Sequence, residues 1–66
     1  MKAKEFNEWF PVGTAVIYTD DFGKEHHTNT RSVAWELGHG EAVVNLLGRT
    51  GGHSLERIKV LESHQA

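Results

Sequence analysis

Apolar and polar residues alternate along much of the chain, a period that is typical of half-buried β-strands. The clearest case is the segment 30–37 (TRSVAWEL), which has Val33, Trp35 and Leu37 at every second position. Alternate side chains share one face of a strand, so this pattern predicts that all three point into the core. Trp35 is the expected centre of that core, and its replacement by alanine is expected to cost about 3–5 kcal/mol.

Short apolar runs separated by turn-forming residues predict further strands. Residues 24–29 are polar and are interpreted as a long loop or as the ragged start of a strand. Glycines within 38–40 and 48–52 predict tight turns, and residues 54–57 have room for one helical turn. The predicted strands are 14–19, 30–37, 41–47 and 58–61, with a very short one around His53.

The N-terminal residues 2–10 follow a helical period instead. Phe6, Trp9 and Phe10 fall at i, i+3 and i+4, which places them on one helical face. Pro11 ends this helix because the residue before a proline avoids the helical region. A helix this short is marginal by itself, so we expect its aromatic face to dock on the domain or on another subunit.

This order of elements predicts a mostly β fold, namely a small five-stranded SH3-like barrel with a short N-terminal helix. The chain is expected to divide into a helical segment at 1–11, the barrel at 12–62 and a disordered tail at 63–66. Closing the sheet removes the exposed strand edges that promote aggregation. The alternative is an open meander whose edges pair with a second copy.

Length and composition bound the class of protein. A chain of 66 residues buries only about 60% of its unfolded surface, which leaves its stability marginal and favours help from a partner subunit. The absence of cysteine removes disulfides and thiolate metal sites, and it fits a reducing cytoplasm. The charged N-terminus does not resemble a signal peptide, and no apolar run approaches the ~20 residues of a membrane span. We therefore expect a cytoplasmic protein without a membrane partner.

The charge balance argues against a polyanionic partner. Nine acidic residues outnumber seven basic ones, which gives a formal net charge of −2. The basic residues are scattered, whereas proteins that bind nucleic acid through charge usually carry a basic patch and a high pI. Nucleic acid is therefore an alternative partner that the charge does not favour.

The sequence offers little catalytic or metal chemistry. Its five histidines lack the spacing of a metal site, and the adjacent His26 and His27 would point to opposite faces of a strand. No nucleophile and base stand at a recognisable spacing. The glycines of residues 48–52 lack the Lys-Ser/Thr ending of a phosphate-binding loop. We predict no catalytic residue, no metal and no cofactor.

Four residues are candidates for binding a partner, namely Tyr18, Arg31, Arg49 and Trp9. Tyr18 and Trp9 are expected to form an aromatic patch with Phe22. Arg31 is expected either to hold the long loop through Asp20, Asp21 or Glu25, or to contact an anion or a partner. Arg49 lies at the tip of the glycine turn, where it can reach a ligand.

A distinctive pattern runs through the chain from Thr30 onwards. It consists of Thr30-Arg31-Ser32, Ala34-Trp35, Leu37-Gly38-His39-Gly40 and Val43-Val44, followed by Gly48, Gly51-Gly52 and Leu55. This pattern resembles that of small uncharacterised proteins of phages, prophages and other mobile elements, written TRSxAWxLGxGxxVV with a GxxGG turn. The resemblance covers roughly residues 12–60, and it implies a mobile-element context without a catalytic assignment.

A second likeness concerns the small-barrel layout and the tail Leu55-Glu56-Arg57-Ile58. Both are similar to plasmid-borne type II dihydrofolate reductase, a tetrameric SH3-like enzyme. The Val-Gln-Ile-Tyr segment with which that enzyme binds its substrate is absent here, so the resemblance implies a fold and not that activity.

Three functions follow from these observations. The leading interpretation is a non-enzymatic interaction module of mobile-element origin that binds protein, its own copies first. The alternative is a nucleic-acid-binding barrel that uses Arg31, Arg49, Arg57 and Lys59. The third is an oligomeric enzyme whose site lies at a subunit junction, because so small a domain rarely offers a substrate pocket by itself.

Overall fold

The computed structural model describes residues 2–61, so the tail predicted at 63–66 lies outside the described residues. The polar segment interpreted as a loop or a ragged strand is a strand. The elements are helix α1 (Ala3–Trp9), strands β1 (Ala15–Thr19), β2 (Glu25–Asn29), β3 (Trp35–Glu36), β4 (Ala42–Asn45) and β5 (Gly52–Ser54), the 3-10 helix η1 (Leu55–Arg57) and strand β6 (Ile58–Val60).

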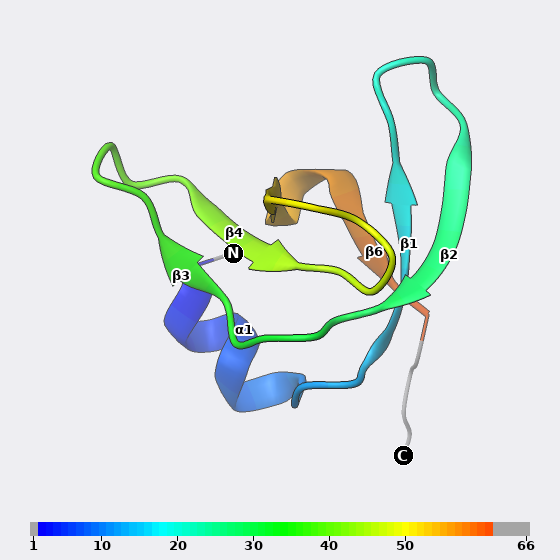
Figure 1. Cartoon of the computed structure of the whole chain (residues 1–66). Coiled ribbons are helices and arrows are strands. Elements are labelled where there is room, and N and C mark those ends of the chain that lie inside the picture. The colour runs from blue at the N-terminus through cyan, green and yellow to red at the C-terminus, as the bar shows by residue number, and fades with distance from the viewer. Residues whose placement is uncertain (1, 62–66) are drawn as a thin grey trace.

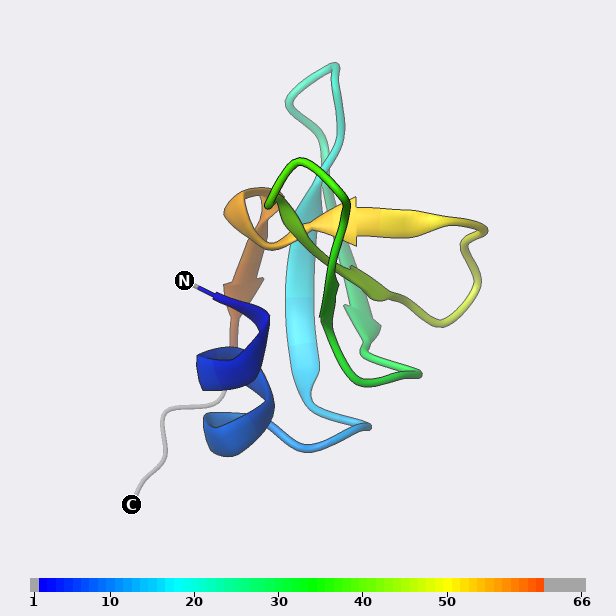
Figure 2. The ribbon, with the colours of Figure 1, turned by 90° about the vertical axis from the view of Figure 1, so that its left-hand side faces the viewer.

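Two antiparallel sheets of three strands each make up the fold. The first has the order β2-β1-β6 and the second has the order β3-β4-β5. Their strands cross steeply, as β1 and β5 do in Figure 2, and a bridge between Thr30 and Leu46 links the two sheets. Within residues 2–61 no continuous pairing closes them into a barrel. The fold is therefore mostly β, with two small sheets and one short α-helix.

The polypeptide passes from the first sheet to the second through an irregular segment at 31–34. Thr30 pairs with Leu46, and Trp35 pairs with Val43. The chain therefore advances five residues from Thr30 to Trp35 while the opposite strand advances only three, from Val43 to Leu46. The two extra residues form a bulge, which bends a strand and increases its twist. β2 and β3 are thus two parts of one bent path that runs along both sheets (Figure 1).

The predicted facing of the segment 30–37 is wrong. Ala34 is 4% exposed, whereas Val33, Trp35 and Leu37 are 59%, 39% and 39% exposed. The inner side of this segment packs against helix α1, which leaves room for the small Ala34 and turns the larger side chains outward. Trp35 is therefore not the centre of the core, and Trp35→Ala is expected to cost less than the about 3–5 kcal/mol of a buried aromatic.

The core instead consists of smaller side chains and one phenylalanine. Thr30 is its buried polar residue, and its Oγ1 accepts a hydrogen bond from the Gly13 N–H at 3.0 Å, which offsets the cost of burial. The buried apolar cluster contains Ala3, Phe6, Val16, Ala34, Ala42, Val44 and Leu46.

Helix α1 docks through only part of the predicted aromatic face. Phe6 is buried, and its ring centroid lies 5.1 Å from that of Phe10, which packs against the core from the side. Trp9 points away and is 73% exposed. The aromatic face thus divides into two residues that fix the helix on its own domain and one that remains at the surface.

Asn7 fixes the helix to the strand segment. Its side-chain Oδ1 accepts a hydrogen bond from the Ala34 N–H at 2.7 Å, and its Nδ2 donates to the Ala34 carbonyl at 2.9 Å. The Leu37 N–H donates to Glu41 on the β4 side, so by alternation the backbone of Ala34 faces the free edge of the sheet. The amide of Asn7 occupies this edge as a neighbouring strand would, which protects it from pairing with another molecule.

We predict that Asn7→Ala lowers the free energy of unfolding by about 1–3 kcal/mol, because it leaves two part-buried backbone groups without their partner. Urea unfolding followed by circular dichroism measures this change. The matched control is Asn29→Ala, which removes one exposed hydrogen bond to the Gly13 carbonyl. Equal effects of the two substitutions would contradict a special role for Asn7.

Candidate functional site

Tyr18 lies at one end of the core, between the two sheets. Val16 is fully buried, and Tyr18 follows it two residues later on the same face of β1. The Tyr18 ring centroid lies 4.5 Å from that of His53 on β5, in an edge-on contact, and 6.0 Å from that of its cross-strand partner His26. We call Tyr18, His26, Arg49 and His53 the Tyr18 cluster.

Arg49 covers the Tyr18 ring from the turn between β4 and β5. Its guanidinium carbon lies 4.6 Å from the ring centroid, a cation–π contact that stabilises by about 0.5–2 kcal/mol. The same turn is held by Arg31, whose Nε donates to the Leu46 carbonyl at 3.0 Å and whose Nη2 donates to the Arg49 carbonyl at 3.2 Å. The cluster therefore rests on a turn that a second arginine braces.

The predicted bridge from Arg31 to the long loop is wrong, because the guanidinium of Arg31 bonds to carbonyls of the β4–β5 turn. The β1–β2 turn is held by its own aspartate. Asp20 Oδ1 accepts from the backbone N–H groups of Phe22 and Lys24, and Oδ2 lies 2.8 Å from His26 Nε2. These bonds, first of all the one from His26, lower the pKa of Asp20 from 3.8 to about 2.

Two nitrogen atoms of the Tyr18 cluster are buried without a hydrogen-bond partner among the described residues, Arg49 Nε and His53 Nδ1. Burial lowers the pKa of His53, and the positive charge of Arg49 lowers it further, while the Gly51 backbone acts in the opposite direction without completing a hydrogen bond to Nδ1. Buried donors are nearly always paired in folded proteins. Both nitrogen atoms therefore lack the partner within residues 2–61 that most buried polar atoms have.

The structure brings three of the four predicted binding residues together. Tyr18, Arg31 and Arg49 meet at the β4–β5 turn. Trp9 lies apart from them, exposed on helix α1. Phe22 is 94% exposed at the tip of the β1–β2 turn. Its ring makes no aromatic contact with Tyr18 or with any other ring of residues 2–61.

Sequence reasoning missed both histidines of the cluster. The alternation of β4 and β5 contained the signal, since His53 pairs with the buried Val44 and so shares its inward face. His26 pairs directly with Tyr18, but the polar segment 24–29 was interpreted as either a long loop or the ragged start of a strand, which left the register of His26 undefined.

A second feature is the outward face of the β3-β4-β5 sheet. Strand alternation and the pairing register place Trp35 beside Val43 on this face, and Trp35 also covers Gly52. A Cβ added to Gly52 would lie 2.9 Å from Val43 Cγ2 and 3.2 Å from Trp35 Cη2, so a glycine is required there. The outward positions of the three strands are Trp35, Val43, Asn45, Gly52 and Ser54, none of which is charged.

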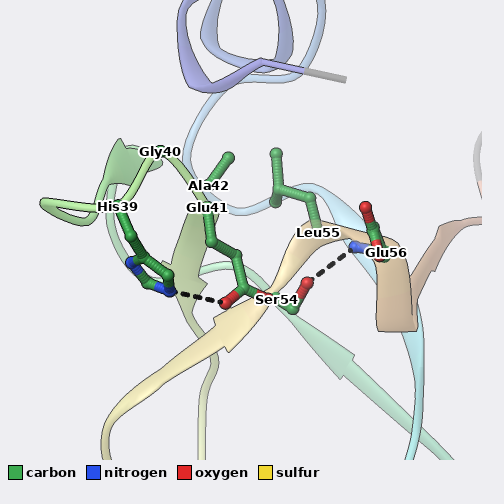
Figure 3. Close-up of a pocket in the computed structure, with 7 residues that line it drawn as sticks. All are labelled: His39, Gly40, Glu41, Ala42, Ser54, Leu55 and Glu56. Carbon is green, nitrogen blue, oxygen red and sulfur yellow. Dashed lines mark hydrogen bonds and ion pairs between the residues drawn. The ribbon is translucent and has the colours of Figure 1, made fainter.

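A hollow of about 380 Å³ lies between the β3–β4 turn and η1 (Figure 3). The His39 ring approaches Glu41 at 3.5 Å, and Ser54 Oγ accepts from the Glu56 N–H at 3.2 Å to begin η1. These polar groups satisfy one another, and no buried unpaired donor among the described residues faces this hollow.

Within residues 2–61 no three His, Asp or Glu side chains converge as metal ligands. No helix there is long and apolar enough to cross a membrane. A scan against protein-family models and searches of curated proteins and of solved structures found no match to the sequence.

We predict that the stability of the fold falls as the pH drops from about 4 to about 2. The pKa of Asp20 is lower in the folded protein than its ordinary 3.8, so its contacts stabilise the fold above that pH and are lost on protonation. Thermal melts across this range measure the loss. Asp20→Asn should flatten the dependence, whereas Asp21→Asn, at an exposed pair with Arg57, should leave it unchanged; identical profiles for all three proteins would contradict the assignment.

Proposed function

We propose that the protein is a non-enzymatic interaction module of mobile-element origin that acts in the cytoplasm and binds protein, a second copy of itself first. The observation that carries this proposal is the outward face of the β3-β4-β5 sheet, whose strand positions carry no charge and where Trp35 is exposed beside Val43. Large apolar side chains gathered on one face of a small protein are typical of a protein–protein interface.

The proposal includes an SH3-like barrel as the scaffold. The bent path of β2 and β3 counts as one strand shared by both sheets, which reduces the six strands of the described residues to the five of such a barrel. The 3-10 helix η1 stands directly before the last strand, β6, which pairs with β1. The Thr30–Leu46 bridge supports the same arrangement, since it joins the two sheets along the bent strand.

A second copy is the favoured occupant for three physical reasons. The two identical faces in a symmetric dimer meet each other, and a face without charge meets its copy without repulsion or burial of ions. Tryptophan is among the residues most enriched in side chains that dominate binding energy. Asn7 already occupies the edge beside β3, which leaves the flat face around Trp35 as the contact surface on that side of the sheet.

Nucleic-acid binding is the second candidate, and one observation favours it. Arg31 and Arg49 lie side by side at the β4–β5 turn, joined by the bond from Arg31 Nη2 to the Arg49 carbonyl. Arg57, in contrast, is paired with Asp21 at 2.9 Å, and the net charge of −2 opposes a polyanion. The protein interface therefore remains the better-supported function.

We predict that light scattering of the wild-type protein shows a mass that rises with concentration towards a dimer. Asn45→Lys should raise the dissociation constant by about tenfold or more, because it places an unpaired charge in the contact. The side chain of Asn45 makes no hydrogen bond within the described residues, so the substitution spares the fold.

The matched control is His27→Lys, which adds the same charge at an exposed position of β2 in the other sheet. It should leave the dissociation constant unchanged. A wild-type protein that remains a monomer at every concentration would overturn the proposal of self-binding, as would equal effects of the two lysines.

A further inference from the structure

The β4–β5 turn carries positive charge without a carboxylate partner. The ion pairs of the described residues join His26 to Asp20, His39 to Glu41 and Arg57 to Asp21. Neither Arg31 nor Arg49 meets a carboxylate in residues 2–61, although acidic residues outnumber basic ones in the sequence. An arginine without an internal carboxylate is available for an external anion.

The guanidinium of Arg49 is positioned but not neutralised. It lies over the Tyr18 ring at 4.6 Å, and its side chain donates no hydrogen bond to residues 2–61. Nε is the one fully covered nitrogen, so the terminal Nη groups keep their donors for a ligand. Arg31 donates to the Arg49 backbone carbonyl at 3.2 Å and thereby holds the turn that carries Arg49.

These groups border a hollow of about 330 Å³ that is lined by Gly48, Arg49, Thr50 and His53. This volume exceeds what a carboxylate needs, given that one water in the liquid takes about 30 Å³. The positive φ of Gly48 and of Gly51, 78° each, folds the turn around the hollow. Arginine is the side chain best suited to bind a carboxylate, through two parallel hydrogen bonds.

We infer that this hollow binds a single carboxylate of a protein partner, on an Asp or Glu side chain or at the carboxyl end of its backbone, with Arg49 as the ligand-binding residue. The inference does not rest on the proposed dimer, because the hollow lies at the β4–β5 turn rather than on the outward sheet face. A phosphate backbone fits less well, since it needs several cationic contacts along its length and the turn offers one pair of arginines.

His53 provides an internal reporter of the bound charge. The His53 ring contacts Tyr18 edge-on and faces the positive charge of Arg49. Two further groups lie nearby: Arg31 bonds to the same turn, and His26 contacts the Tyr18 ring. An anion next to Arg49 offsets this positive charge and favours the protonated imidazole. Binding must therefore raise the pKa of His53 from its lowered value.

The test is a nuclear magnetic resonance titration of the full-length wild-type protein, kept dilute so that self-association does not contribute. Sodium acetate is the probe, added at constant ionic strength against chloride. We expect saturable shifts at Thr50 and His53 and a rise in the pKa of His53. Arg49→Gln should weaken binding by about tenfold or more, and Arg49→Lys by less.

The matched control is Arg57→Gln, which removes the same charge from an exposed pair elsewhere. It should leave the acetate titration unchanged. Shifts that rise linearly without saturation, or that are equal in Arg49→Gln and Arg57→Gln, would overturn the inference. A parallel titration with a DNA duplex that binds at physiological salt more tightly than acetate would overturn it in favour of nucleic acid.

Discussion

The contact between the Asn7 amide and the Ala34 backbone is the constraint on which the arrangement of this molecule depends. It holds a seven-residue helix, too short to be stable by itself, against a sheet edge that would otherwise be open. With the helix in place, Ala34 is the one buried residue of the segment 31–37. Trp35 is thereby turned to the outside, so one internal amide decides which surface the protein presents.

The Tyr18 cluster and the outward face around Trp35 follow from this arrangement and from the bent strand. The bulge carries the polypeptide from the first sheet to the second, and the steep crossing of the sheets leaves Tyr18 and His53 together at one end of the core. Arg49 covers that end with an unneutralised charge, while Trp35 covers the outer face, whose outward strand positions carry no charge. The protein thus presents an exposed tryptophan on one sheet face and a hollow bordered by Arg49 at the β4–β5 turn.

Much of the fold was predictable from the sequence, and the errors have physical causes. Periodicity located β1, β4 and β6, the glycine turns and the short helix to within one or a few residues. It failed at 30–37 because the face with the larger apolar side chains was assigned to the core, whereas Thr30 and Ala34 on the other face are the buried ones. The packing of α1, which favours the small Ala34, cannot be inferred from residue spacing. Tyr18, Arg31 and Arg49 were identified by residue type, whereas His26 and His53 joined them only through cross-strand register. The partner predicted for Arg31 was wrong because carbonyls of a turn leave no signature in the sequence.

The environment of Trp35 is the most direct test, measured by acrylamide quenching of its fluorescence in a Trp9→Phe variant. At low concentration, in the monomer, we predict an emission that acrylamide quenches readily, because the indole lies at the surface. Raising the concentration should protect the indole as its face meets a second copy. A blue-shifted emission that resists quenching already in the monomer would contradict this description, since Trp35 would then lie in the core.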